Sequence, residues 1–430
     1  MERITRSVTL AVILIGATLL FGCGGKTEEA GSGPIEIKVA FWGAPDEVNV
    51  IAEIIKTWQE SHPDITVRLE HTPYRGYAEK LLTRIAGRSA PDIICTEVDL
   101  FVTFQTKGVL LNLTPFIDAD PGLDASAFYP EIIDRFSVAG KLFAIPRDTA
   151  PFACVYYNKR LFDEAGIPYP TDDWDVYDLL DKAKRLTRVD AEGRVLRYGF
   201  YAWAWQNFVY AFGGRLVDNV KEPKECLLNS AESIEGLTFY SDMINKYRVH
   251  PTTTAMANLA MGVQGMFMTE RLAMFSSGIW ETPGLRKMDT FEWDVAMFPK
   301  GPNGIRGFGT GGSGYCILKS TRHPEAAYEV LKALAGRDAQ VILAGTGLTQ
   351  PAMKSVAEVW AGDDLAPKNK SMLLSAIKHT IYDPFSASWR EIKELHIIPA
   401  LDKIFNGNSE VKPAMDSIIG KVNSLLRERQ

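Results

Sequence analysis

Strand-like and helix-like segments alternate from residue 35 onward, and this alternation constrains the fold more than any other feature of the sequence. The apolar run "IEIKVAFWG" precedes "DEVNVIAEIIKTWQESHP", which places four apolar residues at helical spacing: Val48, Ile51, Ile55 and Trp58. "DITVRLE" alternates apolar and polar residues, "GYAEKLLTRIAGRSA" is again amphipathic, and "PDIICTE" supplies a third strand. Strands that alternate with helices predict a parallel α/β sheet. Ligands of such sheets bind beyond the carboxyl ends of the strands, here Trp42-Gly43 and Thr96-Glu97.

The first 22 residues have the organisation of an export signal. Arg3 and Arg6 precede an apolar run of about fourteen residues, too short for a bilayer, which needs about twenty. The run ends in "LFGC", which resembles the lipobox of bacterial lipoproteins, so we expect residues 1–22 to be removed and Cys23 to carry the lipid. A secretion signal that merely contains a cysteine is the alternative. Residues 23–34 are predicted to be a flexible tether.

The composition excludes several classes of function. The chain has 47 basic and 53 acidic residues, a net charge of −6, and no basic run, which argues against a nucleic-acid partner. Its six histidines show no metal-binding spacing, and we expect neither a metal nor another cofactor. Cys95, Cys154, Cys226 and Cys316 form no CxxC pair; buried thiols are the simpler interpretation, and a disulfide stays open in an exported protein.

Four motifs together resemble the family 1 extracellular solute-binding proteins of ABC importers, in their carbohydrate-binding branch. They are "GKLFAIPRDTAPFACVYYNKRLFDEAGIP", "TDDWDVYDLLDKAKRLT", "RLAMFSSGIW" and "HPEAAYEVLKALAG", the last followed by "GTGLTQPA". The resemblance implies an α/β, two-lobed periplasmic-binding-protein fold with a multi-strand hinge and an inter-lobe ligand cleft. Residues 35–146 plus 305–347 would form the N-terminal lobe, and residues 152–300 plus 350–430 the C-terminal lobe. We expect the helix that follows "TDDWD" to be capped near Thr171 and Asp172.

A saccharide offers hydroxyl groups on its rim and apolar C–H faces, so its site needs aromatic rings and polar partners. Trp42 ends the first strand, and Trp203 and Trp205 follow the strand-like "RYGF". The resemblance adds Trp280 in "GIW" and Trp389 in "SASW", and it supports Trp203. The predicted ligand-binding residues are Trp42, Glu97, Asp99, Asp148, Trp203, Trp205, Trp280 and Trp389.

These observations predict an exported, lipid-anchored receptor rather than an enzyme, at the membrane surface or in the periplasm of a bacterium. A monomer would capture a carbohydrate, an oligosaccharide in our interpretation, by hinge closure and deliver it to the permease subunits of an ABC importer. Thr96 stands where one member of this branch has an aromatic residue, so the particular sugar stays open. The alternatives are a non-sugar solute, such as a polyol or a sugar phosphate bound with the help of Arg147, and a secreted glycoside hydrolase with two paired carboxylates.

Overall fold

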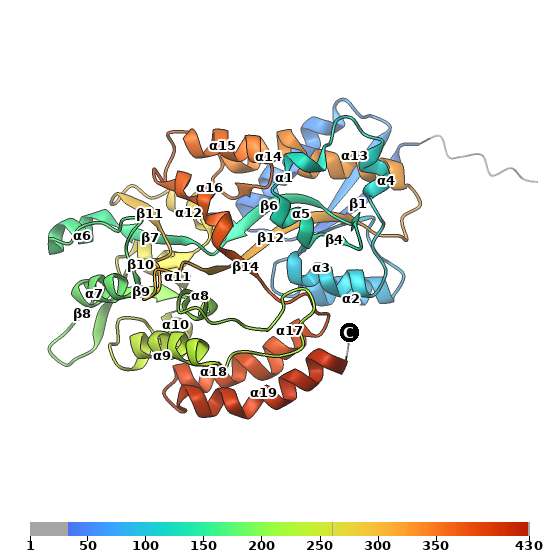
Figure 1. Cartoon of the computed structure of the whole chain (residues 1–430). Coiled ribbons are helices and arrows are strands. Elements are labelled where there is room, and N and C mark those ends of the chain that lie inside the picture. Colours follow the sequence, from blue (N-terminus) through green and yellow to red (C-terminus); the bar gives the residue numbers. More distant parts are fainter. Residues whose placement is uncertain (1–32, 260, 429–430) are drawn as a thin grey trace, which may run out of the picture.

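The computed structural model describes residues 33–259 and 261–428 and contains two large β-sheets with helices packed around them (Figure 1). The export signal, Cys23 and nearly all of the predicted tether lie outside the described residues. Within the described part, no helix is both long enough and apolar enough to cross a membrane.

The first sheet has seven strands in the order β13-β6-β12-β3-β1-β2, with β14 paired to β12. The strands are β1 (Ile35–Phe41), β2 (Ile65–His71), β3 (Ile93–Glu97), β6 (Ile145–Pro151), β12 (Phe308–Ile317), β13 (Gln350–Pro351) and β14 (Thr380–Tyr382). β1 pairs in parallel with both β2 and β3, as the alternating pattern predicted. The sheet as a whole is mixed, because β12 runs antiparallel to β3 and β6, and β13 runs antiparallel to β6. The larger helices on this side are α1 (Pro45–Gln59), α2 (Tyr77–Ala86), α3 (Val98–Thr106), α13 (Pro324–Ala335), α14 (Arg337–Gly345) and α15 (Lys354–Gly362).

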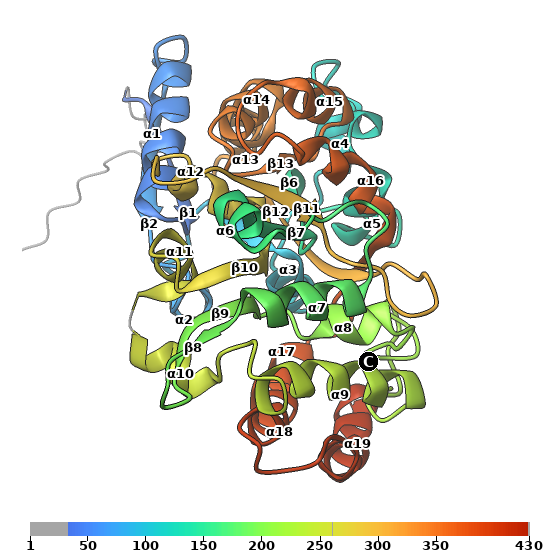
Figure 2. The ribbon, with the colours of Figure 1, turned by 90° about the vertical axis from the view of Figure 1, so that its left-hand side faces the viewer.

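The second sheet has five strands in the order β11-β7-β10-β9-β8, of which β9 and β10 are parallel. The strands are β7 (Cys154–Asn158), β8 (Arg188–Val189), β9 (Val195–Ala202), β10 (Leu272–Ser277) and β11 (Trp293–Met297). Its larger helices are α6 (Lys159–Ala165), α7 (Val176–Leu186), α8 (Gln206–Ala211), α9 (Ala231–Asn245), α18 (Ile398–Phe405) and α19 (Val411–Glu428). Figure 2 shows α9, α18 and α19 side by side at one end of the molecule.

Shorter elements lie along the chain between these strands and larger helices. They are α4 (Thr114–Asp118), α5 (Pro130–Arg135), α10 (Thr253–Leu259), α11 (Gly262–Met268), α12 (Thr282–Leu285), α16 (Leu373–Ala376), α17 (Trp389–Ile392), and the paired strands β4 (Ser137–Val138) and β5 (Lys141–Leu142).

The chain crosses between the sheets where β6 ends and β7 begins. The side chain of Asn207, on α8, fixes this crossing because its amide nitrogen donates to the Phe152 carbonyl at 2.8 Å and its oxygen accepts from the Gly309 amide at 2.8 Å. Asn207 is fully buried, so both hydrogen bonds satisfy polar groups that water cannot reach. The residue boundaries proposed for the two lobes stay a prediction.

One local prediction is wrong. The helix after "TDDWD" begins at Val176, and its cap is Asp175, whose carboxylate accepts from the amides of Tyr177 and Asp178. The Asp178 carboxylate in turn accepts from the Asp175 amide, which completes a capping box. The reciprocal hydrogen bonds of Asp175 and Asp178 therefore determine where α7 begins, and Thr171 and Asp172 lie upstream of this start.

The cysteines follow the simpler interpretation. Cys95, Cys154, Cys226 and Cys316 are all buried and unpaired. Burial raises the pKa of the Cys226 thiol to about 11, so this thiol is protonated and unreactive at neutral pH.

Candidate ligand-binding site

Three aromatic side chains gather where the two sheets meet, and we call them the aromatic platform: Phe152, Trp203 and Trp280. The Phe152 ring lies 4.7 Å from the Trp203 ring and 6.0 Å from the Trp280 ring, both edge-on. The two tryptophan rings are 6.4 Å apart. Trp203 is 39 % exposed, unlike the fully buried rings of the core, so it is available for contact with a ligand.

Strand geometry brings these rings together. Trp203 directly follows β9, and Trp280 lies in the short helical turn after the neighbouring parallel strand β10. The carboxyl ends of parallel neighbours lie at the same edge of a sheet, which is where ligands of α/β sheets bind. Phe152 arrives at this edge from the crossing after β6.

A polar network lies behind the tryptophans. Ser277 Oγ donates to Glu281 Oε1 at 2.9 Å, and Gln264 Nε2 donates to Glu281 Oε2 at 2.6 Å. Trp203 Nε1 lies 3.5 Å from Ser277 Oγ, the long end of hydrogen-bond distance. Burial raises the pKa of Glu281. Because its oxygens are already occupied, Glu281 supports the platform from behind.

A pocket of about 410 Å³ adjoins Trp203, within the range of small-molecule sites. Its wall combines aromatic rings with a few charged groups. Its lining residues include Trp203, Trp205, Tyr240, His250, Asp383, Trp389 and Lys393. Trp205 is half-buried, and Trp389 is only 1 % exposed, so little of the Trp389 ring is open to the pocket.

A second group of side chains comes from the first sheet. The Trp42 ring packs edge-on against Tyr74 at 5.9 Å and Tyr77 at 5.1 Å. The Tyr74 hydroxyl lies 2.9 Å from each carboxylate oxygen of Glu97. Burial, and then the negative charge of Asp99, raise the pKa of Glu97 to about 8.

Lys393 joins the second group to the pocket. Its ammonium lies 3.1 Å from Asp383 Oδ2 and 3.8 Å from Asp99 Oδ2. The Asp383 carboxylate raises the pKa of Lys393, although burial of the amine acts in the opposite direction. Lys393 begins a π-helical turn between α17 and α18, a distortion that is frequent at functional sites.

Asp148 lies in a different environment. It is 4 % exposed, Arg147 Nε contacts its Oδ2 at 2.7 Å, and the amide and hydroxyl of Ser313 donate to it at 2.9 and 2.8 Å. Arg147 in turn donates to Glu47 at 2.7 Å and is itself buried. Arg147 and Asp148 therefore both have protein partners. Because the Arg147 guanidinium is already paired, it no longer supports the alternative of a sugar-phosphate ligand.

The structure thus brings most of the predicted residues to one region. Trp203, Trp205 and Trp389 line the pocket, and Trp280 completes the platform. Trp42, Glu97 and Asp99 form the group that Lys393 joins to the pocket, and Asp148 lies apart in the buried ion cluster.

Four residues of this region were not predicted from the sequence: Phe152, Tyr74, Asp383 and Lys393. Phe152 directly follows Pro151, in a proposed lobe crossing, and this was the one signal that could have marked it. The other three are set by contacts between distant segments.

The raised pKa of Glu97 predicts a stability that depends on pH. Because the folded protein keeps a proton that the unfolded chain releases above about pH 4.5, this contribution is complete below that value and is lost as pH rises through about 8. The unfolding free energy of the wild type should therefore fall between pH 5 and pH 9. In Glu97→Gln this fall should be smaller by at least about 1.4 kcal/mol, the equivalent of one pKa unit. Urea titrations at pH 5, 7 and 9 measure this difference, and parallel pH curves for the two proteins would contradict it.

Two α/β sheets, joined by chain crossings and flanking one aromatic and polar site, are the architecture of a two-lobed solute-binding protein. Residues 44–341 match the family described as bacterial extracellular solute-binding protein, and this chain belongs to that family. The family expected from the sequence motifs is therefore confirmed.

Three similar proteins extend the comparison. A putative binding protein of Brucella abortus is 22 % identical and covers 97 % of this chain and 98 % of its own length. An arabinooligosaccharide-binding protein of Bacillus subtilis is 23 % identical over 84 % of this chain and 82 % of its own. The structure of an ABC substrate-binding protein of Listeria monocytogenes in complex with cycloalternan is 25 % identical, with a TM-score of 0.82 over 91 % of this chain and 98 % of its own. This likeness confirms the predicted two-lobed fold.

Proposed function

We propose that this protein captures a neutral oligosaccharide at the aromatic platform and the adjoining pocket, and delivers it to an ABC-type importer. The observation that carries the proposal is the platform itself, with Trp203 half exposed beside a pocket that also contains carboxylates and an ammonium group. Aromatic faces suit the C–H faces of sugar rings, and charged groups suit their hydroxyls. The relatives named for arabinooligosaccharide and crystallised with cycloalternan support the same ligand class.

The charges of the site favour a neutral ligand over a sugar phosphate. Lys393 is the only cation among the described residues that line the pocket, and it is shared between Asp383 and Asp99. A phosphate would lie among carboxylates, and like charges in a partly buried site repel each other. A polyol would leave the aromatic faces without a ring to stack on.

Membership of an extracellular family supports export, and lipidation at Cys23 would hold the receptor at the membrane surface. We infer that the protein works as a monomer with permease subunits and does not change its ligand chemically. No part of the proposal requires a cofactor.

A thermal-shift panel tests the ligand class. Neutral oligosaccharides should raise the melting temperature, since a ligand at 100 times its Kd adds about 2.7 kcal/mol of stability. The panel would also contain monosaccharides, polyols and sugar phosphates. A response to sugar phosphates or polyols alone would contradict the neutral-saccharide proposal, and shortened oligosaccharide on chromatography after incubation would show a hydrolase instead of a receptor.

A further inference from the structure

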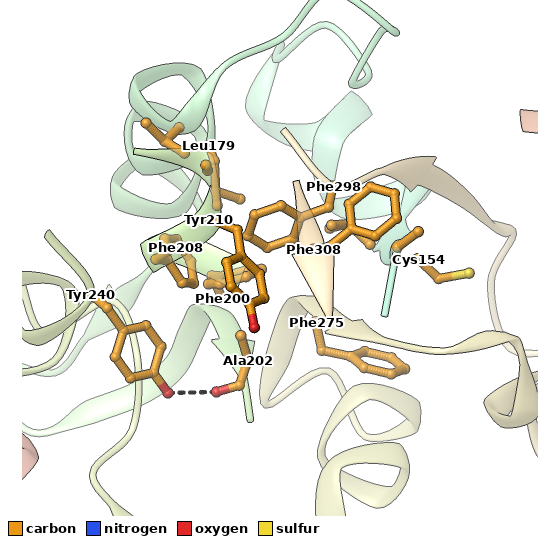
Figure 3. Packing of buried hydrophobic residues seen from close by; sticks show 14 of the residues in the cluster. Cys154, Leu179, Phe200, Ala202, Phe208, Tyr210, Tyr240, Phe275, Phe298 and Phe308 are labelled. Carbon is orange, nitrogen blue, oxygen red and sulfur yellow. Dashed lines mark hydrogen bonds between the residues drawn. The ribbon is translucent and has the colours of Figure 1, made fainter. Parts of the chain in front are cut away.

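Two buried side chains hold the backbone of Ala202, the residue immediately before Trp203. The Tyr240 hydroxyl donates to the Ala202 carbonyl at 2.6 Å, a bond drawn in Figure 3. His250 Nε2 lies 3.0 Å from the Ala202 amide nitrogen. Both side chains are 4 % exposed and line the wall of the pocket beside Trp203. We call this pair the Ala202 clamp.

His250 contacts polar backbone atoms through both ring nitrogens. Nδ1 lies 2.7 Å from the Pro251 carbonyl oxygen, and Nε2 lies 3.0 Å from both the amide nitrogen and the carbonyl oxygen of Ala202. With the proton on Nδ1, at the shorter contact to an oxygen that can only accept, Nε2 accepts from the Ala202 amide. Burial lowers the pKa of His250 to about 4, which keeps the ring neutral and this arrangement intact at physiological pH.

The clamp holds β9 at the point where the platform begins. Two residues earlier, the Phe200 amide donates to the Val249 carbonyl at 3.1 Å, so the 249–250 segment follows β9 to its last residue. The indole nitrogen of Trp203 reaches Ser277 only at 3.5 Å, so the ring is oriented by its packing against Phe152 and Trp280 and by its own backbone. The direction of the ring therefore depends in part on the backbone that the clamp fixes.

We propose that Tyr240 and His250 are positioning residues for saccharide binding. They hold Ala202 so that the Trp203 ring is presented at a fixed angle beside Phe152, and they do not need to contact the sugar. A ring that is ordered before binding loses less conformational entropy when the ligand arrives. This inference rests on the proposed function, because it assumes that Trp203 stacks on a sugar.

The test compares three variants of the full-length protein in calorimetric titrations with the neutral oligosaccharide that gives the largest thermal shift. Tyr240→Phe removes only the hydroxyl, and His250→Leu removes the acceptor. His250→Gln places an amide oxygen where it can accept from Ala202. Losing one hydrogen bond of this kind should raise the Kd by about 3- to 10-fold for the first two variants, and His250→Gln should recover most of the loss.

Tyr328→Phe is the matched control, because Tyr328 is also 4 % exposed and its hydroxyl is hydrogen-bonded, to Asp120 at 3.2 Å. Tyr328 lies on α13, beside the first sheet and away from the platform. The Kd of Tyr328→Phe should therefore equal that of the wild type even if the melting temperature of the variant falls. Near-ultraviolet circular dichroism of the unliganded proteins adds a direct readout, since a released Trp203 ring should lose signal in the clamp variants only.

The outcomes separate the two proposals. If the wild type binds the sugar and the folded clamp variants keep its Kd and its tryptophan signal, the positioning role is wrong. An equal loss of affinity in Tyr328→Phe would likewise overturn it, because general destabilisation would then explain the effect. If the wild type binds no saccharide at all, the proposed function fails, and an unchanged tryptophan signal in the clamp variants would overturn the positioning role independently.

Discussion

The Arg147→Ala variant is expected to lose about 3–5 kcal/mol of unfolding free energy, the cost of leaving buried charges without their partner. The Arg147 side chain is 6 % exposed and lies between the carboxylates of Glu47 and Asp148, each 2.7 Å away. These carboxylates raise the pKa of Arg147 against the effect of its burial. Without the guanidinium, two negative charges would share a region that water hardly reaches.

The same change should also weaken ligand binding, because the cluster ties α1 of the first layer to β6 and, through Ser313, to β12 at the crossing. Urea denaturation measures the stability, and calorimetry measures the affinity of the folded fraction.

Arg194→Ala is the matched control for this prediction. Arg194 Nε also lies 2.7 Å from an aspartate, Asp190 Oδ2, but its side chain is 76 % exposed. An exposed ion pair contributes about 0–1 kcal/mol, so the same chemical change should be nearly silent there. Comparable losses in the two variants would show that burial of the Arg147 cluster does not determine its contribution.

Much of the first sheet could be predicted because its signals are local. The alternation of strand and helix patterns between residues 35 and 97 predicted β1, β2 and β3, and the pairing of β1 with both neighbours confirms it. The start of α7 could not be predicted by residue type alone, since several capping residues precede it and only the reciprocal Asp175–Asp178 bonds select one.

The site was predictable only where a strand end marks it. Trp203 was marked by its position after a strand-like run, and Trp280 by the family resemblance of "GIW"; in the structure both follow the parallel strands β9 and β10. Asp148 shows the limit of this reasoning. Its environment is made by Ser313, 165 residues away, and by Arg147, which Glu47 holds from 100 residues away. Contacts between residues so far apart in the sequence leave no local pattern from which they can be predicted. Lys393 and Asp383 were missed for the same reason.

Trp203→Ala should raise the Kd for the saccharide by about 30- to 150-fold, which corresponds to about 2–3 kcal/mol, as for a buried aromatic anchor of an interface. The reason is that Trp203 offers the most exposed ring of the platform: Phe152 contacts it edge-on, and Trp280 lies tilted beside it with the ring centres 6.4 Å apart. Stability should change little, since a side chain that is 39 % exposed contributes less to the core than a buried one. Calorimetric titration measures the Kd, and thermal unfolding without ligand measures the stability.

Trp58→Ala provides the control for this prediction. Trp58 is also half-buried and stacks on a neighbouring ring, His62 at 4.0 Å, but it lies near the end of α1, outside the pocket and the platform. Removal of the Trp58 ring should leave the Kd unchanged. Trp203→Phe keeps a smaller aromatic face, so its Kd should lie between those of the wild type and Trp203→Ala. A Kd for Trp203→Ala within about 3-fold of the wild type, less than one typical hydrogen bond, would mean that the sugar binds elsewhere. The graded order of Trp, Phe and Ala at position 203 therefore distinguishes stacking on this ring from a general effect of losing a tryptophan.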